Sequence, residues 1–358
     1  MKKAIVPLIL VASILAAAYS FTRPKSPQPN SLNQAGSTQA NQPEKSSSVR
    51  SSSSPSNPIT ISRGNPSPSD STQESDDLPQ VKPAGEAYAS AEEAMEAVLK
   101  GSRDYDDSIL EQFTQPGPEC SWCLAFYDSA REKATNPSTP QEQRAYLAEI
   151  LAISGKLENV QTLAESIKMA RSNDEADLYA EALELSLGND EVVRYLGDQM
   201  VSPNDTLREA SVAAVTNQGT VQSVELLSKH VKERGDPDGY YSSGIGPAEL
   251  IPDEDALPAV QELIHSRDDF SHLWVKSALN AGMPGLRIVM AELETSPNPA
   301  FDDQLLKDAM DHVNLEDGLQ EFADETIQRN KSPSAVKFAK KIKEEFSQQE
   351  DEASGGDS

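Results

Sequence analysis

The sequence predicts an all-α protein whose main body is an α-solenoid of about six helix pairs, each about 32 residues long. Apolar residues recur at helical spacing from residue 86 onward, and turn-forming residues follow one another at a nearly constant interval. No run of alternating β-branched residues is long enough to indicate a strand. On this basis the chain divides into five segments, which are residues 1–21, 22–84, 85–138, 139–347 and 348–358.

The first segment has the three parts of a secretory signal. Two lysines follow the initiating methionine, residues 4–21 carry no charge, and Ala16 and Ala18 form an A-x-A pattern. As a helix, the uncharged run would be about 27 Å long, close to the ~30 Å core of a bilayer, so it could also remain as a signal anchor. We expect export across the cytoplasmic membrane to its periplasmic or extracytoplasmic face, with the protein either membrane-anchored or secreted.

The second segment, residues 22–84, is rich in serine and proline. It contains 16 Ser and 10 of the 24 Pro in the chain, and almost no large apolar residues. Too little apolar surface is available to offset the ~1–2 kcal/mol per residue that backbone ordering costs, so we expect a disordered linker. Such a linker would reach roughly 40–48 Å and could tether the body away from a membrane. The alternative is a tolerated low-complexity insertion.

The strong negative charge lies in the remaining residues. The whole chain has a net charge of −27, and residues 85–358 contain 23 Lys and Arg against 53 Asp and Glu. This charge excludes unaided binding to nucleic acid and argues against docking on an anionic membrane, so we expect membrane contact only through an uncleaved N-terminal segment. It favours a protein partner with a basic patch. Solubility or adaptation to salt would explain the charge equally well.

The third segment, residues 85–138, is expected to form a small helical cap. Ser90 and Glu93 make a capping box at the start of a helix that Gly101 ends. Apolar spacing over residues 109–113 indicates a second short helix, and a third is expected to begin near residue 119.

The cap carries the only two cysteines of the chain, in the run Cys120-Ser121-Trp122-Cys123. In an exported protein the simplest outcome is a local disulfide that holds a helix start. A redox-active pair of the thioredoxin type is the alternative, although the sequence shows neither the preceding strand nor the following βαβ unit of that fold. A shared metal or intermolecular site is the third interpretation. Haem attachment would need a histidine where Leu124 stands.

The fourth segment, residues 139–347, contains the repeat. Its breakers follow apolar helical runs and are separated by 33, 31, 63 and 32 residues, of which 63 is two periods. The breakers are Gly155, Gly188, Gly219, Gly282 and Asn314. Each unit has the pattern helix, break, helix, and such a pair cannot bury its apolar face alone. Stacking of neighbouring pairs therefore supplies the core.

One unit, over residues 203–234, carries a recognisable motif. Leu207-Arg208-Glu209-Ala210 begins its first helix, and a turn at Gly219 leads to a second helix rich in Val and Leu. This unit resembles the short HEAT-like repeat, and the resemblance implies a curved stack of antiparallel helix pairs that serves as a binding scaffold. A tetratricopeptide array is the competing interpretation, but its period is ~34 residues and its signature positions do not recur here.

A stretch rich in glycine and proline, residues 235–250, interrupts the repeat and excludes a regular helix. Tyr240 and Tyr241 lie within it and are the candidate partner-binding residues, because Tyr is enriched at interfaces. The alternative is a degenerate repeat in which these tyrosines cover a gap in the core.

No catalytic, cofactor-binding or metal-binding residue can be picked out. No HExxH motif is present, and the acidic pairs Asp268-Asp269 and Asp302-Asp303 are expected to lie on solvated faces. The four histidines lack metal spacing and are expected to be ordinary helix-surface or groove residues; they are His230, His265, His272 and His312. The sequence thus predicts an exported, non-catalytic protein-binding scaffold without a cofactor, ending in an acidic tail that frays. The alternative function is a thiol-disulfide redox protein that uses Cys120 and Cys123.

Overall fold

The computed structural model describes residues 81–114, 120–235, 246–314 and 318–355, with side chains as far as Ser347. All of these residues belong to one compact unit, Gln73–Ser358. Within them the secondary structure consists of α-helices and two short 3-10 helices, without any strand. The predicted all-α, solenoid-like fold is confirmed. The signal or anchor expected over residues 1–21 lies outside the described residues, as does the expected linker as far as residue 80. The last helix continues to Gly355, past residue 348 where the acidic tail was expected to begin.

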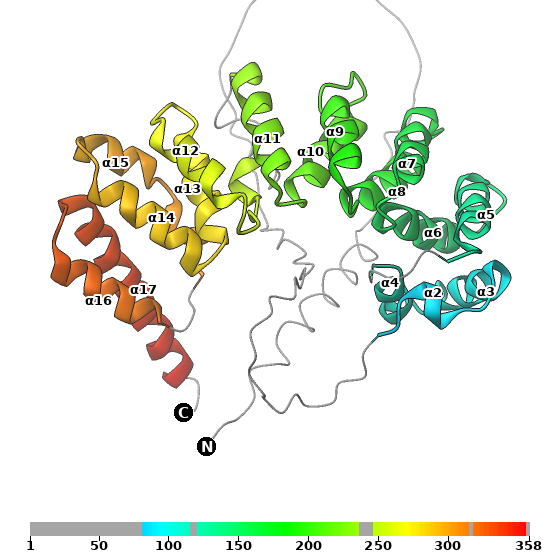
Figure 1. Ribbon diagram of the computed structural model, residues 1–358, viewed down its shortest axis with the longest axis horizontal. Helices are drawn as coiled ribbons and strands as arrows, with labels where there is room; N and C mark the ends of the chain where they lie inside the picture. Colours follow the sequence, from blue (N-terminus) through cyan, green and yellow to red (C-terminus); the bar gives the residue numbers. More distant parts are fainter. Residues whose placement is uncertain (1–80, 115–119, 236–245, 315–317, 356–358) are drawn as a thin grey trace, which may run out of the picture. The chain divides into compact units, whose positions relative to one another are not determined.

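The helices follow one another in space in the order that they have in the chain (Figure 1). The N-terminal four are α2 (Ala84–Ala87), α3 (Ala91–Gly101), α4 (Asp107–Thr114) and α5 (Cys123–Thr135). Next come α6 (Gln141–Ile153), α7 (Leu157–Met169), α8 (Asn173–Glu184), α9 (Asp190–Gln199), α10 (Asp205–Thr216) and α11 (Val221–Arg234). The remainder are η2 (Pro247–Glu249), α12 (Leu257–His265), α13 (Ser271–Asn280), α14 (Met283–Glu294), α15 (Pro299–Leu305), η3 (Ala309–His312), α16 (Leu319–Arg329) and α17 (Pro333–Gly355). Among the described residues, none of these helices combines the length and apolar character that a membrane crossing needs.

Successive helices form two rows. In the first-helix row α6 packs on α8 and α8 packs on α10, while in the second-helix row α5, α7, α9 and α11 lie side by side. Each helix also packs against its sequence neighbour in the other row, as α7 does on α8 and α9 on α10. This arrangement is the one that the pattern helix, break, helix predicts for a stacked array.

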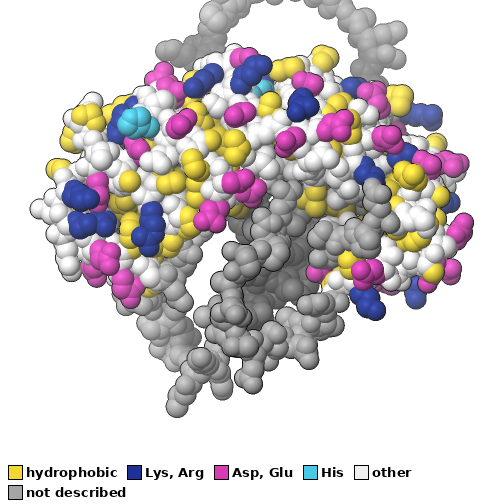
Figure 2. Space-filling model, in the orientation of Figure 1, with side chains coloured by type: hydrophobic (Ala, Val, Ile, Leu, Met, Phe, Trp, Pro, Cys, Tyr) yellow, Lys and Arg dark blue, Asp and Glu magenta, His cyan; other side chains and the backbone are white. Residues whose placement is uncertain are grey.

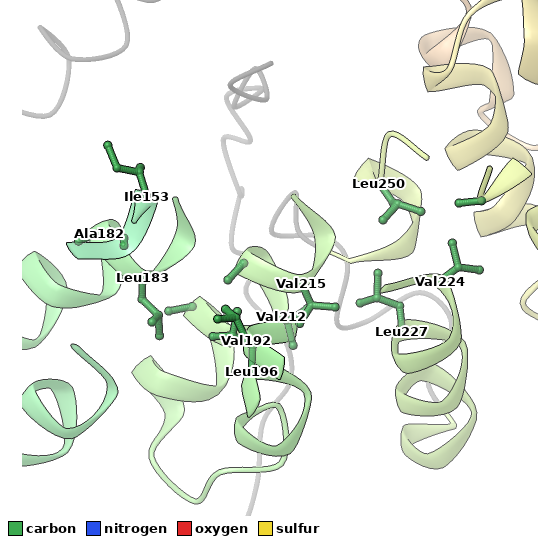
Figure 3. Close-up of a cluster of buried hydrophobic side chains, with 14 of the residues drawn as sticks. Ile153, Ala182, Leu183, Val192, Leu196, Val212, Val215, Val224, Leu227 and Leu250 are labelled. Carbon is green, nitrogen blue, oxygen red and sulfur yellow. The ribbon is translucent and has the colours of Figure 1, made fainter. Parts of the chain in front are cut away.

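The core lies between the two rows and runs from α2 to α17 as one cluster of buried side chains. Figure 3 shows its middle part, where Leu183, Leu196, Val212 and Leu227 extend from four different helices. Each of these four side chains is almost completely buried. Since burial of such a side chain is worth about 1.5–3 kcal/mol, the apolar faces hold neighbouring pairs together.

The turns within successive pairs are joined by hydrogen bonds. They reach from each turn to the preceding one, and the two ends are 30 to 35 residues apart, in agreement with the predicted period. They include Leu187 N to Ala152 O (3.3 Å), Asn217 Nδ2 to Glu184 O (2.9 Å), Asp253 N to Gly219 O (2.8 Å), Asn280 Nδ2 to Ala248 O (2.8 Å) and to Leu250 O (3.3 Å), and Asn314 Nδ2 to Asn280 O (3.2 Å).

The hydrogen bonds also locate the turn that the spacing of 63 residues left out. Residues 250–253 occupy it, because Asp253 N donates to the turn before and Leu250 O accepts from the turn after. Gly219 makes the close approach possible: its φ is +69°, and a Cβ there would lie 2.5 Å from the carbonyl oxygen of Ile251. The turn at residues 250–253 contains no glycine, so the spacing of glycines in the sequence did not predict it.

The predicted interruption after α11 is seen within the described part. Among the described residues, the three-residue helix η2 stands where the first helix of this pair would lie, and it packs against α13 and α11. Residues 236–245 lie outside the described residues. The helix that follows, α12, begins at Leu257 with Pro258 in its first turn.

The cap helices begin and end close to their expected positions, with two differences. Ser90 Oγ accepts from Glu93 N as the capping box predicts. The Glu93 carboxylate should accept from Ser90 N in a capping box, but it accepts from Ala89 N at 2.8 Å. The third helix of the cap, α5, begins at Cys123 and not near residue 119. Its start is shaped by the turn in which Cys123 N donates to Cys120 O at 3.2 Å.

Candidate functional site

Four glutamates on the first-helix row form a group in which two members have raised pKa values, and we call it the glutamate cluster. Its members come from three successive helices of that row: Glu149 from α6, Glu181 and Glu184 from α8, and Glu209 from α10. The interval from Glu149 to Glu181 is 32 residues, which is one repeat period. Stacking of α6 on α8 and of α8 on α10 therefore brings the four carboxylates to one side of the array.

Glu149 is partly buried, and its surroundings favour the neutral form. Burial raises its pKa to about 7, and the charges of Asp107 and Glu181 act in the same direction. The hydroxyl of Tyr105 donates to Glu149 Oε2 and opposes this shift, because the bond stabilises the carboxylate. Glu149 is thus a carboxyl group that changes its charge near neutral pH.

Glu184 has a similar environment one repeat further along. Burial again is the main cause that raises its pKa to about 7, and the charges of Glu181 and Glu209 add to it. Glu181 is therefore close enough to influence both partly buried carboxyls. Like charges collected in this way repel one another, and a cation bound among them would relieve the repulsion.

The cap holds one end of the glutamate cluster in place. Tyr105 lies between α3 and α4 with a φ of +50°, and its ring meets the edge of Tyr146 at a centroid distance of 5.6 Å. The buried Tyr146 hydroxyl donates to Asp106 O at 2.6 Å. These contacts orient the Tyr105 hydroxyl toward Glu149, although the Tyr105 side chain is 42 % exposed.

Charge of both signs is spread over the rest of the surface. Figure 2 shows acidic and basic side chains interspersed, with apolar side chains between them, on the face in view. No group of three or more metal-ligating side chains is found within the described residues. The carboxylates of the glutamate cluster can attract cationic groups, and Glu149 and Glu184 can exchange protons near neutral pH.

The cysteine pair lies at the start of α5. Cys120 and Cys123 are joined in a disulfide with their Cα atoms 5.3 Å apart, and the intervening Trp122 donates from Nε1 to Tyr88 O at 3.1 Å. The Trp122 ring also contacts Phe126 edge-on at 6.1 Å. The disulfide ring thus forms the turn into α5, where the side chain of the N-cap residue makes no capping hydrogen bond.

The two candidate partner-binding residues, Tyr240 and Tyr241, lie outside the described residues, so their role stays a prediction.

The four histidines lie apart from the glutamate cluster and make contacts within or between helices. Burial and the charge of Arg234 lower the pKa of His230 to about 4. The contacts of the other three are His265 Nδ1 with Glu292 Oε2, His272 Nδ1 with Asp269 O, and His312 Nδ1 with Asn280 Oδ1, each at 3.0 Å.

One expectation about the acidic pairs is wrong. Asp302 is only 1 % exposed, and its Oδ1 accepts hydrogen bonds from Arg267 Nη1 at 3.0 Å and Ser296 Oγ at 2.6 Å. Adjacent acidic residues on a helix point in different directions, and the direction of Asp302 is toward the preceding helix pair. Asp303, by contrast, is exposed and pairs with Lys337 at 2.6 Å.

Sequence reasoning missed the glutamate cluster. The available signal was the interval of one repeat period between Glu149 and Glu181, but glutamates are common on the polar faces of helices and carry no motif. Comparison with known proteins adds no identification: no protein-family model matches this chain, and no curated protein matches it significantly.

Proposed function

We propose that the helical body is a non-catalytic protein-binding scaffold whose glutamate cluster receives a basic segment of a partner protein. The observation that carries this proposal is the convergence of Glu149, Glu181, Glu184 and Glu209 from α6, α8 and α10. A stacked array displays equivalent positions of successive repeats along one continuous surface, which suits an elongated partner segment. Lys and Arg side chains of such a segment would replace repulsion among the carboxylates by attraction.

The raised pKa values of Glu149 and Glu184 give this proposal a specific consequence. Near pH 7 both groups are about half protonated, and a bound cation favours the ionised form. Binding of a basic segment therefore releases protons. By linkage, its affinity rises as the pH increases from about 6 to about 8.

The proposal includes the location that the sequence indicates. Residues 1–21 direct the chain across the cytoplasmic membrane, where they are cleaved or remain as an anchor, and residues 22–84 tether the body as a flexible linker. The helical body is proposed to be HEAT-like, on the strength of the motif that starts with Leu207-Arg208-Glu209-Ala210. The observed stacking of helix pairs supports this assignment.

Fluorescence anisotropy with the full chain tests the proposal. The probe is a fluorescent polylysine peptide, and an uncharged peptide of the same length serves as the negative probe. We expect the glutamine variant of all four cluster residues to weaken polylysine binding about tenfold or more, since each charge pair contributes about 0.2–1 kcal/mol. The matched control replaces four exposed glutamates on other helices, Glu132, Glu225, Glu262 and Glu325, by glutamine.

At pH 8, where the cluster carboxylates are mostly ionised, the two variants have nearly the same net charge, so general attraction of polylysine to an acidic protein affects both alike. An equal loss of affinity in both would overturn the proposed site. Equal binding at pH 6 and pH 8 would contradict the involvement of Glu149 and Glu184.

A further inference from the structure

A groove at the N-terminal end of the described body has a different character from the glutamate cluster. It lies between α3 and α5 and has a volume of about 680 Å³. Ala91, Met95 and Leu99 of α3 line it at four-residue intervals, and Ala125 lines it from α5. This spacing puts the three α3 side chains on one stripe of the helix, so the groove has an apolar wall that follows the α3 axis.

The groove is open because α5 presents small side chains to it. Ala125 and Ser129 are four residues apart and both line the groove. The two helices start side by side, since Trp122 at the start of α5 donates to Tyr88 O just before α3. They leave room between them that no other described element fills, and Ala125 is exposed.

Charges of both signs line the groove. Glu92 lies in the first turn of α3 and Glu96 at its middle, whereas Lys100, Arg103 and Lys133 lie toward the ends of the two helices. Within the described residues, none of these three cations forms an ion pair with a carboxylate. In a chain with a net charge of −27, three neighbouring cations without an acidic partner stand out.

The helix dipole accounts for only part of this arrangement. Lys100 and Lys133 lie in the last turns of α3 and α5, where a cation is stabilised by the helix C-terminus. Arg103 lies beyond the end of α3, and the dipole explains neither its place on the groove nor the apolar wall beside it.

We propose that this groove receives an amphipathic α-helix of a partner protein, with an apolar stripe that faces Leu99 of α3 and the exposed Ala125 of α5. Acidic residues flank that stripe and lie over Lys100, Arg103 and Lys133. A helix is the occupant that fits, because two helices that start side by side can pack a third helix along the apolar channel between them. Such a helix would contact the channel through apolar side chains three or four residues apart in its sequence. The acidic flank is required by charge complementarity with the three cations.

This surface is independent of the proposed function. It lies on helices other than α6, α8 and α10, and it attracts a partner segment of the opposite charge. Loss of one surface by mutation should leave the other intact.

Fluorescence anisotropy with the full chain tests the groove. The probe is a designed helical peptide with a leucine stripe flanked by glutamates, and the control peptide has the same composition with the leucines distributed around the helix. We expect the variant K100E/R103E/K133E to weaken binding of the amphipathic peptide about tenfold or more. The matched control K307E/K340E/K341E makes the same change in net charge at three exposed lysines far along the chain from the groove, and we expect its affinity to change less than about twofold.

A second variant tests the groove without changing its charge. Ala125→Trp replaces an exposed small residue by one that fills the channel, so the peptide should be displaced while the fold is retained, as circular dichroism would show. The proposal is overturned if the full chain binds both peptides equally. It is also overturned if K100E/R103E/K133E and its control lose affinity equally, or if Ala125→Trp folds and binds as the unmodified chain does.

Discussion

The side-chain amide of Asn280 donates to the carbonyl oxygen of Ala248 at 2.8 Å, while its Oδ1 lies 3.0 Å from His312 Nδ1. One asparagine, at the end of α13, thus connects three successive turns, each 32 residues from the next. Asn217 has a simpler version of this role, with a single bond of 2.9 Å to Glu184 O. The turns are therefore bonded along the array by side chains as well as by the packing of helices.

Replacement of Asn280 by alanine should destabilise the body by about 1–3 kcal/mol, because partly buried partners lose their hydrogen bonds. Asn217→Ala removes one bond at an exposed position and should cost about 0.5–1.5 kcal/mol. Urea denaturation followed by circular dichroism measures both. If the two variants were equally stable, the connecting role of Asn280 would be refuted.

Breaking the buried ion pair between Arg267 and Asp302 should reduce the stability of the body by a larger amount. Removal of one partner leaves the other charge buried and unpaired, which costs about 3–5 kcal/mol, so Arg267→Ala should strongly destabilise the C-terminal helix pairs. Lys337→Ala, which breaks the exposed pair with Asp303, is the control and should cost less than about 1 kcal/mol. Thermal unfolding of the two variants compares them, and equal melting temperatures would contradict the prediction.

Gly285 lies where α14 closely approaches α13. A Cβ at this position would lie 1.7 Å from the carbonyl oxygen of Ala278, so α13 and α14 must move apart in Gly285→Ala. We expect a loss of about 1–3 kcal/mol or more, despite the better helix propensity of alanine. Ala291→Ser, on the exposed side of α14, is the control. If chemical denaturation showed that Gly285→Ala is more stable than the unmodified chain, the close approach of α13 and α14 would not be needed for stability.

The pH dependence of stability should carry the signature of Glu149 and Glu184. Their pKa values are raised to about 7 from the ordinary value of 4.5, so the folded protein binds more protons than the unfolded chain between these pH values. The free energy of unfolding therefore decreases as the pH rises from about 4.5 to about 7, and the loss is complete above that window.

The double variant Glu149→Gln/Glu184→Gln should remove this slope and be more stable than the unmodified chain at pH 8, by on the order of 1–3 kcal/mol. Glu132→Gln/Glu262→Gln is the matched control at exposed sites and should keep the slope. Denaturation curves at a series of pH values provide the test; an unchanged slope in the cluster variant would mean that these two groups titrate in the ordinary range.

The properties of the disulfide between Cys120 and Cys123 on reduction should show whether it is a structural bridge or a redox-active pair. Its ring is so small that reduction should cost about 2 kcal/mol or less of stability in the chain-entropy description. As a structural bridge it should have a reduction potential below about −300 mV and no insulin-reductase activity. Equilibration with glutathione measures the potential. A value near those of thioredoxin or glutaredoxin together with activity would instead support thiol-disulfide exchange.

The sequence by itself determined the helical class, the period of about 32 residues and the place of most turns. These follow from local chemistry: apolar spacing specifies a helix face, and Gly155 and Gly219 end helical runs with positive φ angles. It also indicated the interruption after α11, because glycine and proline exclude a regular helix wherever they accumulate.

Only the tertiary structure decided which polar residues are buried and which charges meet. Asp302 and Asp303 are neighbours in sequence, yet one is buried against Arg267 and the other is exposed, since their directions depend on the adjacent helix pair. The same holds for Glu149 and Glu184, whose pKa values respond to burial and to carboxylates on neighbouring helices. Burial and electrostatic neighbourhood are sums over distant parts of the chain, and a local pattern does not contain them.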